Sequence, residues 1–305
     1  MKYLISILGP TGIGKTKISI NLANFFKTEI ISCDSRQFYK ELKIGTSIPN
    51  FNYLKKVKHH FIGHISIFED YNVYTFQNDA INILKKLFKS YNIVFIVGGS
   101  FLYEKSVIEG INYIPNINKK LLFIYREKLY KKSLNILLNK VKKKDYFFFK
   151  KILKKKKDKR KIIRALEIIH FTKKKISYFY KRKKKKKPFN KYIRIGIIDD
   201  RQKIYNNINN KVDKMIKKGL FYEVKKLYKY RKLNSLNTIG YKEFFPFLKK
   251  KEYDLNICIN KIKQNTRNYA KRQIIWLRKI KKIKFFKPNE INKIKNFIIN
   301  KIKLW

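Results

Sequence analysis

Short apolar runs alternate with amphipathic segments along the first hundred residues of the chain. Residues 3–8 (YLISIL), 29–33 (EIISC) and 93–97 (IVFIV) have the length and composition of strands buried in a parallel sheet. Residues 15–26 and 79–87 carry apolar side chains at helical spacing. Glycine directly follows the first and the third of these runs. This order of strands and helices predicts an α/β fold built on a parallel sheet.

The alternating pattern stops near residues 111–115, and a basic segment with helical spacing begins. Residues 116–190 have this character throughout. Between residues 140 and 187 there are 24 lysines and arginines and only three acidic residues. We therefore expect residues 116–190 to form a mostly helical, strongly basic insertion domain.

Strand character returns after the basic segment. Residues 192–198 (YIRIGII) predict a strand that rejoins the sheet, and residues 201–282 are mostly helical in pattern. We therefore expect residues 1–115 and 191–305 to form one α/β core with a helical tail, interrupted by the insertion domain.

A phosphate-binding loop is the strongest local signal in the sequence. Residues 9–16 (GPTGIGKT) match G-x-x-x-x-G-K-[ST] and lie between a predicted strand and a predicted helix, as this motif requires. Its glycines let backbone N–H groups approach phosphate oxygens at a helix N-terminus, and its threonine hydroxyl can ligate Mg²⁺. The sequence therefore predicts a P-loop NTPase-like sheet flanked by helices, with a site for a diphosphate, which both ATP and a prenyl diphosphate carry. The residues expected to bind it are Gly9, Pro10, Thr11, Gly12, Ile13, Gly14, Lys15 and Thr16, with Thr16 as the metal ligand.

Two further polar segments follow predicted strands. Residues 34–37 (DSRQ) come directly after the second strand, and residues 98–100 (GGS) come after the strand at 93–97. Ligands of open parallel sheets bind beyond the carboxyl ends of the strands, so we expect both segments near the phosphate loop. Asp34 would act there as a general base or as a group close to Mg²⁺. The alternative is that this segment only forms a turn or a helix cap.

Two histidines, His60 and His64, are four residues apart and would share one face of a helix. A zinc site on that face would need further ligands, for which Glu69 and Asp70 are the nearby candidates. Packing or contact with a substrate is the preferred interpretation of these histidines.

The region near the carboxyl end predicts an amphipathic helix. Its apolar stripe, with a spacing of seven residues, is expected to pack on the core and consists of Ile262, Tyr269 and Trp276. Basic side chains that fall on nearly the opposite side are Arg267, Lys271 and Arg278. This second side would face a polyanion or, alternatively, only solvent.

Composition narrows the class of protein. The chain has 305 residues, of which 44% are hydrophobic, so it can bury a sizeable core and is not expected to be disordered. Its two cysteines, Cys33 and Cys258, cannot build a disulfide framework, which fits a reducing cytoplasm. No stretch approaches 18 uncharged apolar residues. We expect a cytoplasmic monomer without a membrane partner.

The charge of the chain is extreme, because 76 lysines and arginines face only 20 acidic residues, a formal net charge of +56. One interpretation is a polyanionic partner, most simply a nucleic acid. The other is compositional drift, since the chain has only four alanines and is rich in residues that AT-rich codons encode. Composition leaves both open, and for the wholly basic run at 181–187 a solvated loop is preferred.

Eight segments, taken together and in this order, resemble the motifs of the tRNA dimethylallyltransferase (tRNA isopentenyltransferase) family. They are GPTGIGKT at 9–16, DSRQFYKELKIGTSIP at 34–49, HHFI at 59–62, VGGSFLY at 97–103, DKRKIIRALEI at 158–168, VDKMIKKGLFYEV at 212–224, IGYKE at 239–243 and TRNYAKRQIIWLR at 266–278. Many phosphate-loop proteins share the first segment, but few would share all eight, so the combination is specific.

The resemblance implies a transferase. It would move a dimethylallyl group from dimethylallyl diphosphate to N6 of the adenosine at position 37 of tRNA, next to the anticodon, and release diphosphate. It also implies Mg²⁺ as cofactor and a tRNA gripped between core and insertion. The adenine would be flipped out to meet the prenyl donor in a channel through the core.

The resemblance further implies roles for individual residues. The loop amides and Lys15 would stabilise the leaving diphosphate, while Asp34 would orient the adenine N6 amine or accept its proton. Ser100 stands where the family usually has threonine. The implied catalytic residues are Asp34, Lys15, Thr11 and Ser100. Those implied to contact tRNA are Asp34, Ser35, Arg36, Gln37, Ser100, Arg160, Lys161, Ile162, Ile163, Arg164 and Arg267, with diphosphate as the alternative partner of Arg164.

Two other functions are compatible with parts of the sequence. A nucleotide or small-molecule kinase would share the phosphate loop, but it would close an arginine-bearing lid over ATP. A non-catalytic RNA-binding protein would keep the loop only as a scaffold.

Overall fold

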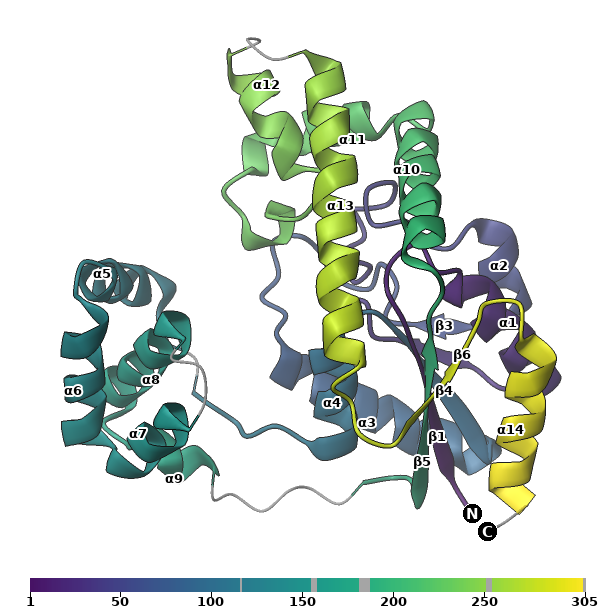
Figure 1. The fold of residues 1–305 in the computed structure, drawn as a ribbon, viewed down its shortest axis with the longest axis horizontal. Coiled ribbons are helices and arrows are strands. Elements are labelled where there is room, and N and C mark those ends of the chain that lie inside the picture. Colours follow the sequence, from purple (N-terminus) through teal and green to yellow (C-terminus); the bar gives the residue numbers. More distant parts are fainter. Residues whose placement is uncertain (116, 155–157, 181–186, 251–253, 304–305) are drawn as a thin grey trace. The chain divides into compact units, whose positions relative to one another are not determined.

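The chain folds into two compact units in the computed structural model (Figure 1). Met1–Glu109 and Lys187–Trp305 form the core unit, and Gly110–Lys186 form the insertion unit. The residues that the structure describes are 1–115, 117–154, 158–180, 187–250 and 254–303. Most of the basic run at 181–187 therefore lies outside the described residues.

The core unit is built on a parallel sheet. Its strands are β1 (Tyr3–Leu8), β2 (Ile30–Ser32), β3 (His59–His60), β4 (Ile93–Gly98), β5 (Lys191–Ile197) and β6 (Ile283–Phe286), in the order β3-β2-β4-β1-β5-β6. The central strand β1 pairs along its whole length with β4 on one side and β5 on the other. Ile5 of β1, for example, lies opposite Phe95 and Ile193. The predicted parallel α/β fold is confirmed.

Helices cover both faces of this sheet, which explains why the central strands β1 and β4 are almost wholly apolar. Successive residues of β1 point to opposite faces. Leu4 packs in one cluster with side chains of α3 and α4, whereas Ile5 and Ile7 pack in another with side chains of α1 and α14. These helices are α1 (Lys15–Phe25), α3 (Val73–Ser90), α4 (Phe101–Glu109) and α14 (Ile291–Lys303). A short helix, α2 (Phe51–Lys56), precedes β3.

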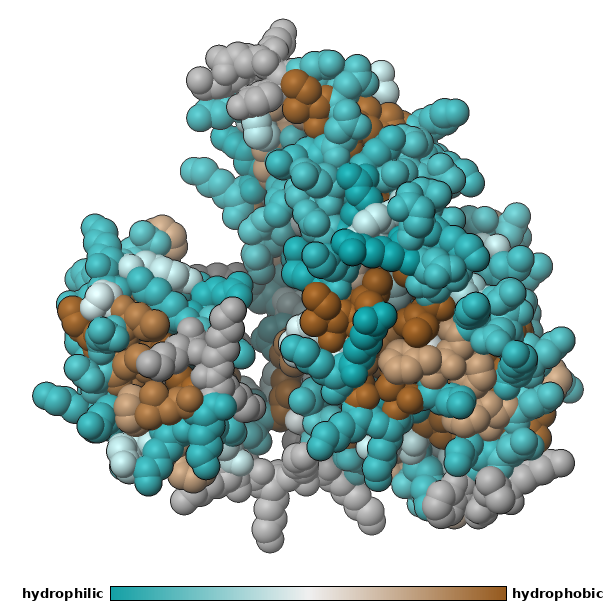
Figure 2. Space-filling model, in the orientation of Figure 1, coloured by the Kyte–Doolittle hydropathy of each residue, from teal (hydrophilic) through white to brown (hydrophobic). Residues whose placement is uncertain are grey.

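A second group of helices completes the core unit. It consists of α10 (Arg201–Lys217), α11 (Leu220–Leu227), α12 (Phe245–Lys250) and α13 (Leu255–Leu277). Helices α10 and α13 pack side by side (Figure 1). On the face that Figure 2 shows, the side chains of this group are mainly hydrophilic. Among the described residues, no helix combines the length and the apolar character needed to cross a membrane.

The insertion unit is helical throughout its described secondary structure. Its helices are α5 (Lys119–Tyr130), α6 (Leu134–Lys144), α7 (Tyr146–Leu153), α8 (Lys159–Thr172) and α9 (Ile176–Tyr180). Helix α8 contributes more buried side chains to its hydrophobic core than any other of these helices. The buried carboxylate of Asp145 accepts hydrogen bonds from the backbone N–H groups of Phe148 (3.0 Å) and Ser177 (2.8 Å), and thereby ties α7 to α9. The predicted helical character of this segment is confirmed.

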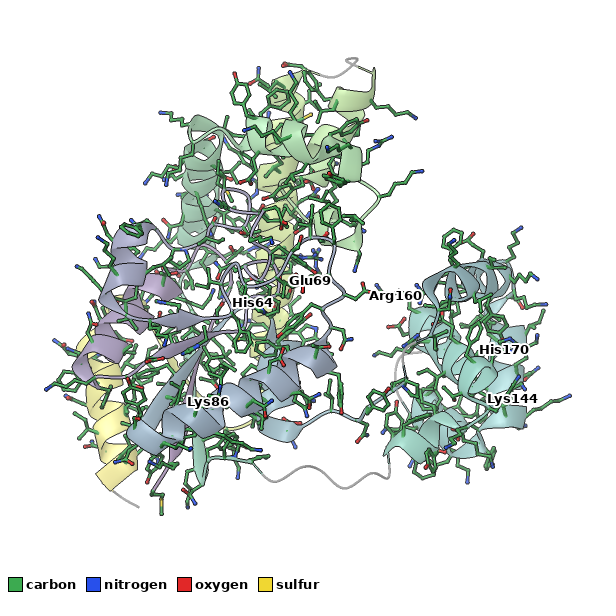
Figure 3. All side chains as sticks on the ribbon, turned by 180° about the vertical axis from the view of Figure 1, so that it is seen from behind. His64, Glu69, Lys86, Lys144, Arg160 and His170 are labelled. Carbon is green, nitrogen blue, oxygen red and sulfur yellow. The ribbon has the colours of Figure 1, made fainter. Side chains whose placement is uncertain are left out.

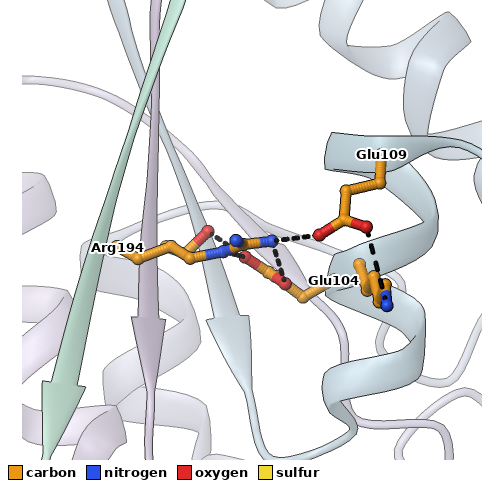
Figure 4. Close-up of polar contacts among 5 residues, drawn as sticks. Glu104, Glu109 and Arg194 are labelled. Carbon is orange, nitrogen blue, oxygen red and sulfur yellow. Dashed lines mark hydrogen bonds and ion pairs between the residues drawn. The ribbon is translucent and has the colours of Figure 1, made fainter. Parts of the chain in front are cut away.

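One buried ion pair joins the sheet to α4 (Figure 4). The Arg194 guanidinium on β5 donates to the Glu104 carboxylate at 2.8 Å, and Ser6 on β1 donates to the same carboxylate at 2.9 Å. The side chains of Arg194 and Glu104 are 6% and 1% exposed. Glu109 adds a second contact to Arg194 at 3.4 Å. Because Glu104 is four residues beyond Ser100, this network fixes the start of α4 beneath the candidate site.

Three expectations about secondary structure need correction. His60 lies in β3, where it pairs with Ile31, and His64 lies in a loop, so the two do not share a helical face. The expected helical tail is not purely helical, because it contributes β6 to the sheet before α14. In α13, Trp276 is 54% exposed, because the buried side of this helix runs through Ala270, Gln273 and Leu277 instead.

Candidate active site

The phosphate loop connects β1 to α1. Gly12 and Gly14 have φ angles of 80° and 88°, which residues with side chains adopt only at a cost. Gly14 directly precedes α1, whose first N–H groups have no partners within the helix. Together with the positive end of the helix dipole, these N–H groups make the start of α1 a binding site for anions.

Lys15 is folded back over this loop. Its ammonium donates to the carbonyl oxygens of Gly9 (2.9 Å) and Pro10 (2.8 Å). Burial lowers the pKa of Lys15 to about 8, and the nearby Asp34 carboxylate partly opposes this shift. The lysine is thus a poorly solvated cation next to an anion site, where a diphosphate would stabilise its charged form.

Asp34 follows β2 and begins a tight turn. Its carboxylate accepts the N–H of Arg36 at 3.2 Å, and its carbonyl accepts the N–H of Gln37 at 3.0 Å. The Ser100 hydroxyl, which follows β4, accepts the N–H of Ser35 at 3.3 Å. The fold therefore brings the segments at 34–37 and 98–100 together at the carboxyl end of the sheet.

Two neighbouring cavities meet at Asp34. The first, the phosphate-loop cavity, has a volume of about 310 Å³ and is lined among others by Gly12, Lys15, Thr16, Ser32, Gln37 and His59. The second, the acceptor cavity, has a volume of about 300 Å³ and is lined among others by Arg36, Ile208, Met215, Ile239, Thr266 and Tyr269. Residues shared by both linings are Thr11, Asp34, Thr46, Ser47 and Lys211. Both cavities lie within the core unit.

Sequence reasoning assigned no role to two residues of this site. Lys211 on α10 lines both cavities; burial lowers its pKa, and the Asp34 carboxylate opposes the shift. Gln273 on α13 is buried, accepts the N–H of Thr11 and donates to the carbonyl of Gly99, each at 2.9 Å. Gln273 therefore joins the phosphate loop to the segment that carries Ser100.

Of the other predicted site residues in the core unit, Arg36 lines the acceptor cavity, whereas Arg267 is not part of its lining. Arg36 donates to the carbonyls of Asn234 and Ser235, both at 3.4 Å. Arg267 on α13 donates to the side chain of Asn209 at 2.8 Å. Tyr269 also lies at the cavity wall, where burial, with a smaller contribution from Asp34, raises its pKa to about 12. Its phenol therefore remains neutral and able to donate a hydrogen bond at physiological pH.

The predicted site residues at 160–164 belong to the insertion unit. The Arg160 side chain is 82% exposed and projects from α8 (Figure 3). Arg164 pairs with the buried carboxylate of Glu167 at 3.1 Å. Ile162 and Ile163 are 0% and 1% exposed, because they fill the hydrophobic core of this unit. Their side chains are therefore not accessible to tRNA, so that a contact at these two positions would have to come from the backbone.

The histidines of the core unit have packing partners. His60 Nε2 lies 2.6 Å from Glu29, and the His64 ring packs edge-on against the rings of Phe38 and Phe61. Figure 3 shows His64 in the core unit. In the described part of the chain, no three His, Cys, Asp or Glu side chains are grouped so that they could hold a metal ion. Packing is thus the role that these contacts support for His64.

The fold and the site together define a class of protein. It is a phosphate-loop α/β protein whose anion-binding loop opens into two cavities that share a carboxylate. Within this class, residues 37–280 match the model of the IPP transferase family. The chain belongs to the IPP transferase family.

Relatives match the chain over nearly its whole length. It is 44% identical to a tRNA dimethylallyltransferase of Christiangramia forsetii over 98% of each chain. It is 42% identical to a tRNA dimethylallyltransferase 2 of Azobacteroides pseudotrichonymphae, over 96% of this chain and 94% of the relative. These matches confirm the resemblance that the eight segments indicate.

Solved structures agree with this assignment. The tRNA isopentenylpyrophosphate transferase of Bacillus halodurans superposes with a TM-score of 0.72 at 32% identity, and the match covers 99% of this chain and 97% of that one. A eukaryotic dimethylallyltransferase acting on tRNA superposes with a TM-score of 0.75 at 27% identity, covering 96% of this chain and 75% of that one.

Proposed function

We propose that this protein is a tRNA dimethylallyltransferase that modifies N6 of adenosine 37. The observation that carries the proposal is the position of Asp34, whose side chain belongs to the walls of both cavities. One cavity contains the phosphate loop, and the other has space and apolar surface for a base. Together with membership of the IPP transferase family, this arrangement favours group transfer from a diphosphate to a second substrate over the kinase and the pure RNA binder.

The phosphate-loop cavity would hold the diphosphate of dimethylallyl diphosphate. Backbone N–H groups at residues 12–16 and the Lys15 ammonium would stabilise the negative charge that grows on the leaving diphosphate. Lys211 would add a second cation from α10, since it lines the same cavity. Thr11 belongs to the linings of both cavities, so it would lie close to the bond that breaks.

The donors of the phosphate-loop cavity fit Mg²⁺. Thr16 contributes a hydroxyl and Asp34 a carboxylate to its lining. Mg²⁺ prefers oxygen ligands, keeps several waters and takes most of its protein contacts from one or two carboxylates beside substrate phosphates. When bound, the ion would supply positive charge next to the leaving group. We propose Thr16 as its ligand from the protein.

The acceptor cavity would receive the flipped adenine. Base extrusion is required because an exocyclic amine within a stacked helix is not accessible to an electrophile in line with its leaving group. The N6 lone pair would form the bond to C1 of the dimethylallyl group while the bond from C1 to the diphosphate oxygen breaks. Asp34 would orient the amine and accept the N6 proton. Ser100, through its contact with Ser35, would hold this segment in place.

We propose two groups of tRNA contacts. In the core unit they are Ser35, Arg36, Gln37, Ser100 and Arg267. In the insertion unit Arg160, Lys161 and Arg164 remain candidates, and Arg160 and Arg164 lie four residues apart on one side of α8. Arg164 would serve either the tRNA or the diphosphate. The net positive charge of the protein would support this contact with a polyanion.

An Asp34→Ala variant tests the assignment. With dimethylallyl diphosphate and unmodified tRNA, mass spectrometry of the nucleosides should show N6-dimethylallyl adenosine for the unchanged protein. The variant should react about 10²- to 10⁴-fold more slowly, the range of general acid–base catalysis, while its affinity for tRNA stays the same. ATP turnover in the absence of tRNA would instead support a kinase, and tRNA binding without any transfer would support a binding protein.

A further inference from the structure

The wall between the two cavities contains a short loop at residues 43–47, the neck loop. Its residues Thr46 and Ser47 belong to the linings of both cavities. Ser47 has a φ of 51°, in the left-handed region that residues other than glycine seldom adopt. Such a conformation persists only where the surroundings determine it. The contacts of this loop therefore decide how the two cavities meet.

One carboxylate collects the backbone N–H groups of the neck loop. Glu223 on α11 accepts hydrogen bonds from Lys43 (3.1 Å), Ile44 (2.9 Å) and Gly45 (3.1 Å). On the other side of the loop, the Gln37 side chain donates to the carbonyls of Thr46 (3.3 Å) and Ser47 (3.1 Å). The loop is thus held through its amides by Glu223 and through its carbonyls by Gln37.

Tyr241 adds a fourth hydrogen bond to Glu223 and connects the neck loop to residues 239–242. The fully buried Tyr241 hydroxyl donates to Glu223 at 2.6 Å. A Cβ on Gly45 would lie only 2.3 Å from the Tyr241 ring, so the loop backbone packs directly on this ring. The neighbours of Tyr241, Ile239, Gly240 and Lys242, also line the acceptor cavity.

From this geometry we infer that Glu223, which accepts the hydrogen bond of Tyr241, is a positioning residue for the transfer reaction. It lines neither the phosphate-loop cavity nor the acceptor cavity. It sets the bend of the neck loop and its distance from residues 239–242, and so fixes the opening through which the prenyl carbon meets the adenine. The inference rests on the proposed function, since it assigns the loop to the boundary between the two substrates.

Replacing Glu223 by glutamine tests this role. A carboxylate can accept all four hydrogen bonds, whereas the amide has one acceptor oxygen and turns an NH₂ group toward the remaining donors. The neck loop should therefore shift. With both substrates saturating, the single-turnover rate of E223Q should fall about 10- to 100-fold, as expected for a misplacement of about 1 Å, while affinity for tRNA is retained.

Glu41→Gln is the matched control. The Glu41 carboxylate also holds a loop of the core unit, through the Ser66 hydroxyl (2.7 Å) and the Ile67 N–H (2.9 Å), but neither of these two residues lines either cavity. E41Q should lose stability to urea as E223Q does and keep the full rate. Equal rates for E223Q and E41Q, corrected for the folded fraction, would overturn the inference.

Two milder variants cover the case in which E223Q does not fold. Tyr241→Phe keeps the ring and the three N–H bonds, so its rate should fall less than that of E223Q. Gly45→Ala forces the loop away from the ring and should slow transfer as E223Q does. Full activity of both variants would also overturn the inference. Absence of transfer by the unchanged protein would refute the proposed function instead, so the two failures are distinguishable.

Discussion

Replacing Gln273 by leucine should uncouple the phosphate loop from the segment after β4. Leucine has a similar volume, so the main loss is that of the two 2.9 Å hydrogen bonds, from the Thr11 N–H and to the Gly99 carbonyl. A buried polar group left without a partner costs about 1–3 kcal/mol. The Gly99 carbonyl is buried and bears most of this cost, whereas Thr11 lies at a cavity wall where water can replace the amide.

The expected loss in the free energy of unfolding is therefore about 1–3 kcal/mol, measured by urea denaturation. The variant should also bind the prenyl donor on the order of tenfold more weakly, because Thr11 and its neighbours are no longer fixed. Gln202→Leu on the exposed face of α10 is the matched control and should change stability by less than about 0.5 kcal/mol. If Q273L unfolds at the same urea concentration as the control and keeps its donor KM, Gln273 does not brace the loop.

Two further variants test charges in the core unit. The Lys15 ammonium has a pKa of about 8, below its usual value of 10.5, so its charge disappears as pH rises through 8. The donor KM should therefore increase from about pH 7 to pH 9, and Lys15→Met should abolish that dependence; an unchanged slope in K15M would assign it to another group. Arg194→Met should cost about 3–5 kcal/mol of unfolding free energy, because Glu104 would be left charged and buried. Adding Glu104→Leu should recover most of that loss, and a double variant as unstable as the single one would contradict this cause.

The parts of the fold with continuous local signals are predictable from sequence. The strands at 3–8 and 93–97 are apolar apart from Ser6, because helices cover both faces of the sheet. By contrast, β3 has only two residues and owes its strand geometry to pairing with β2. Similarly, β6 is short, and lysines surround and interrupt it, so that its pairing with β5 defines it rather than its own pattern.

In the candidate site, too, the sequence predicts contiguous motifs but not residues whose partners are distant in the sequence. The phosphate loop and the segment at 34–37 are contiguous motifs, and their residue types alone indicate their chemistry. Gln273 forms hydrogen bonds with residues that are 262 and 174 positions away in the sequence, and Glu223 with a loop about 180 positions away. No local pattern connects such residues. Helical periodicity likewise predicts a stripe that includes Trp276, but only tertiary packing decides which side of α13 is covered.

The strand order also governs how this chain can be made. Strand β1, which leads into the phosphate loop, takes one neighbour from before the insertion unit and the other from after it. During translation, one edge of β1 must therefore wait unpaired while the whole insertion unit is synthesised, and such edges invite aggregation. Helix α13, whose Gln273 holds the phosphate loop, is synthesised later still. A chain truncated before β5 would thus contain only four of the six strands and leave one edge of β1 exposed.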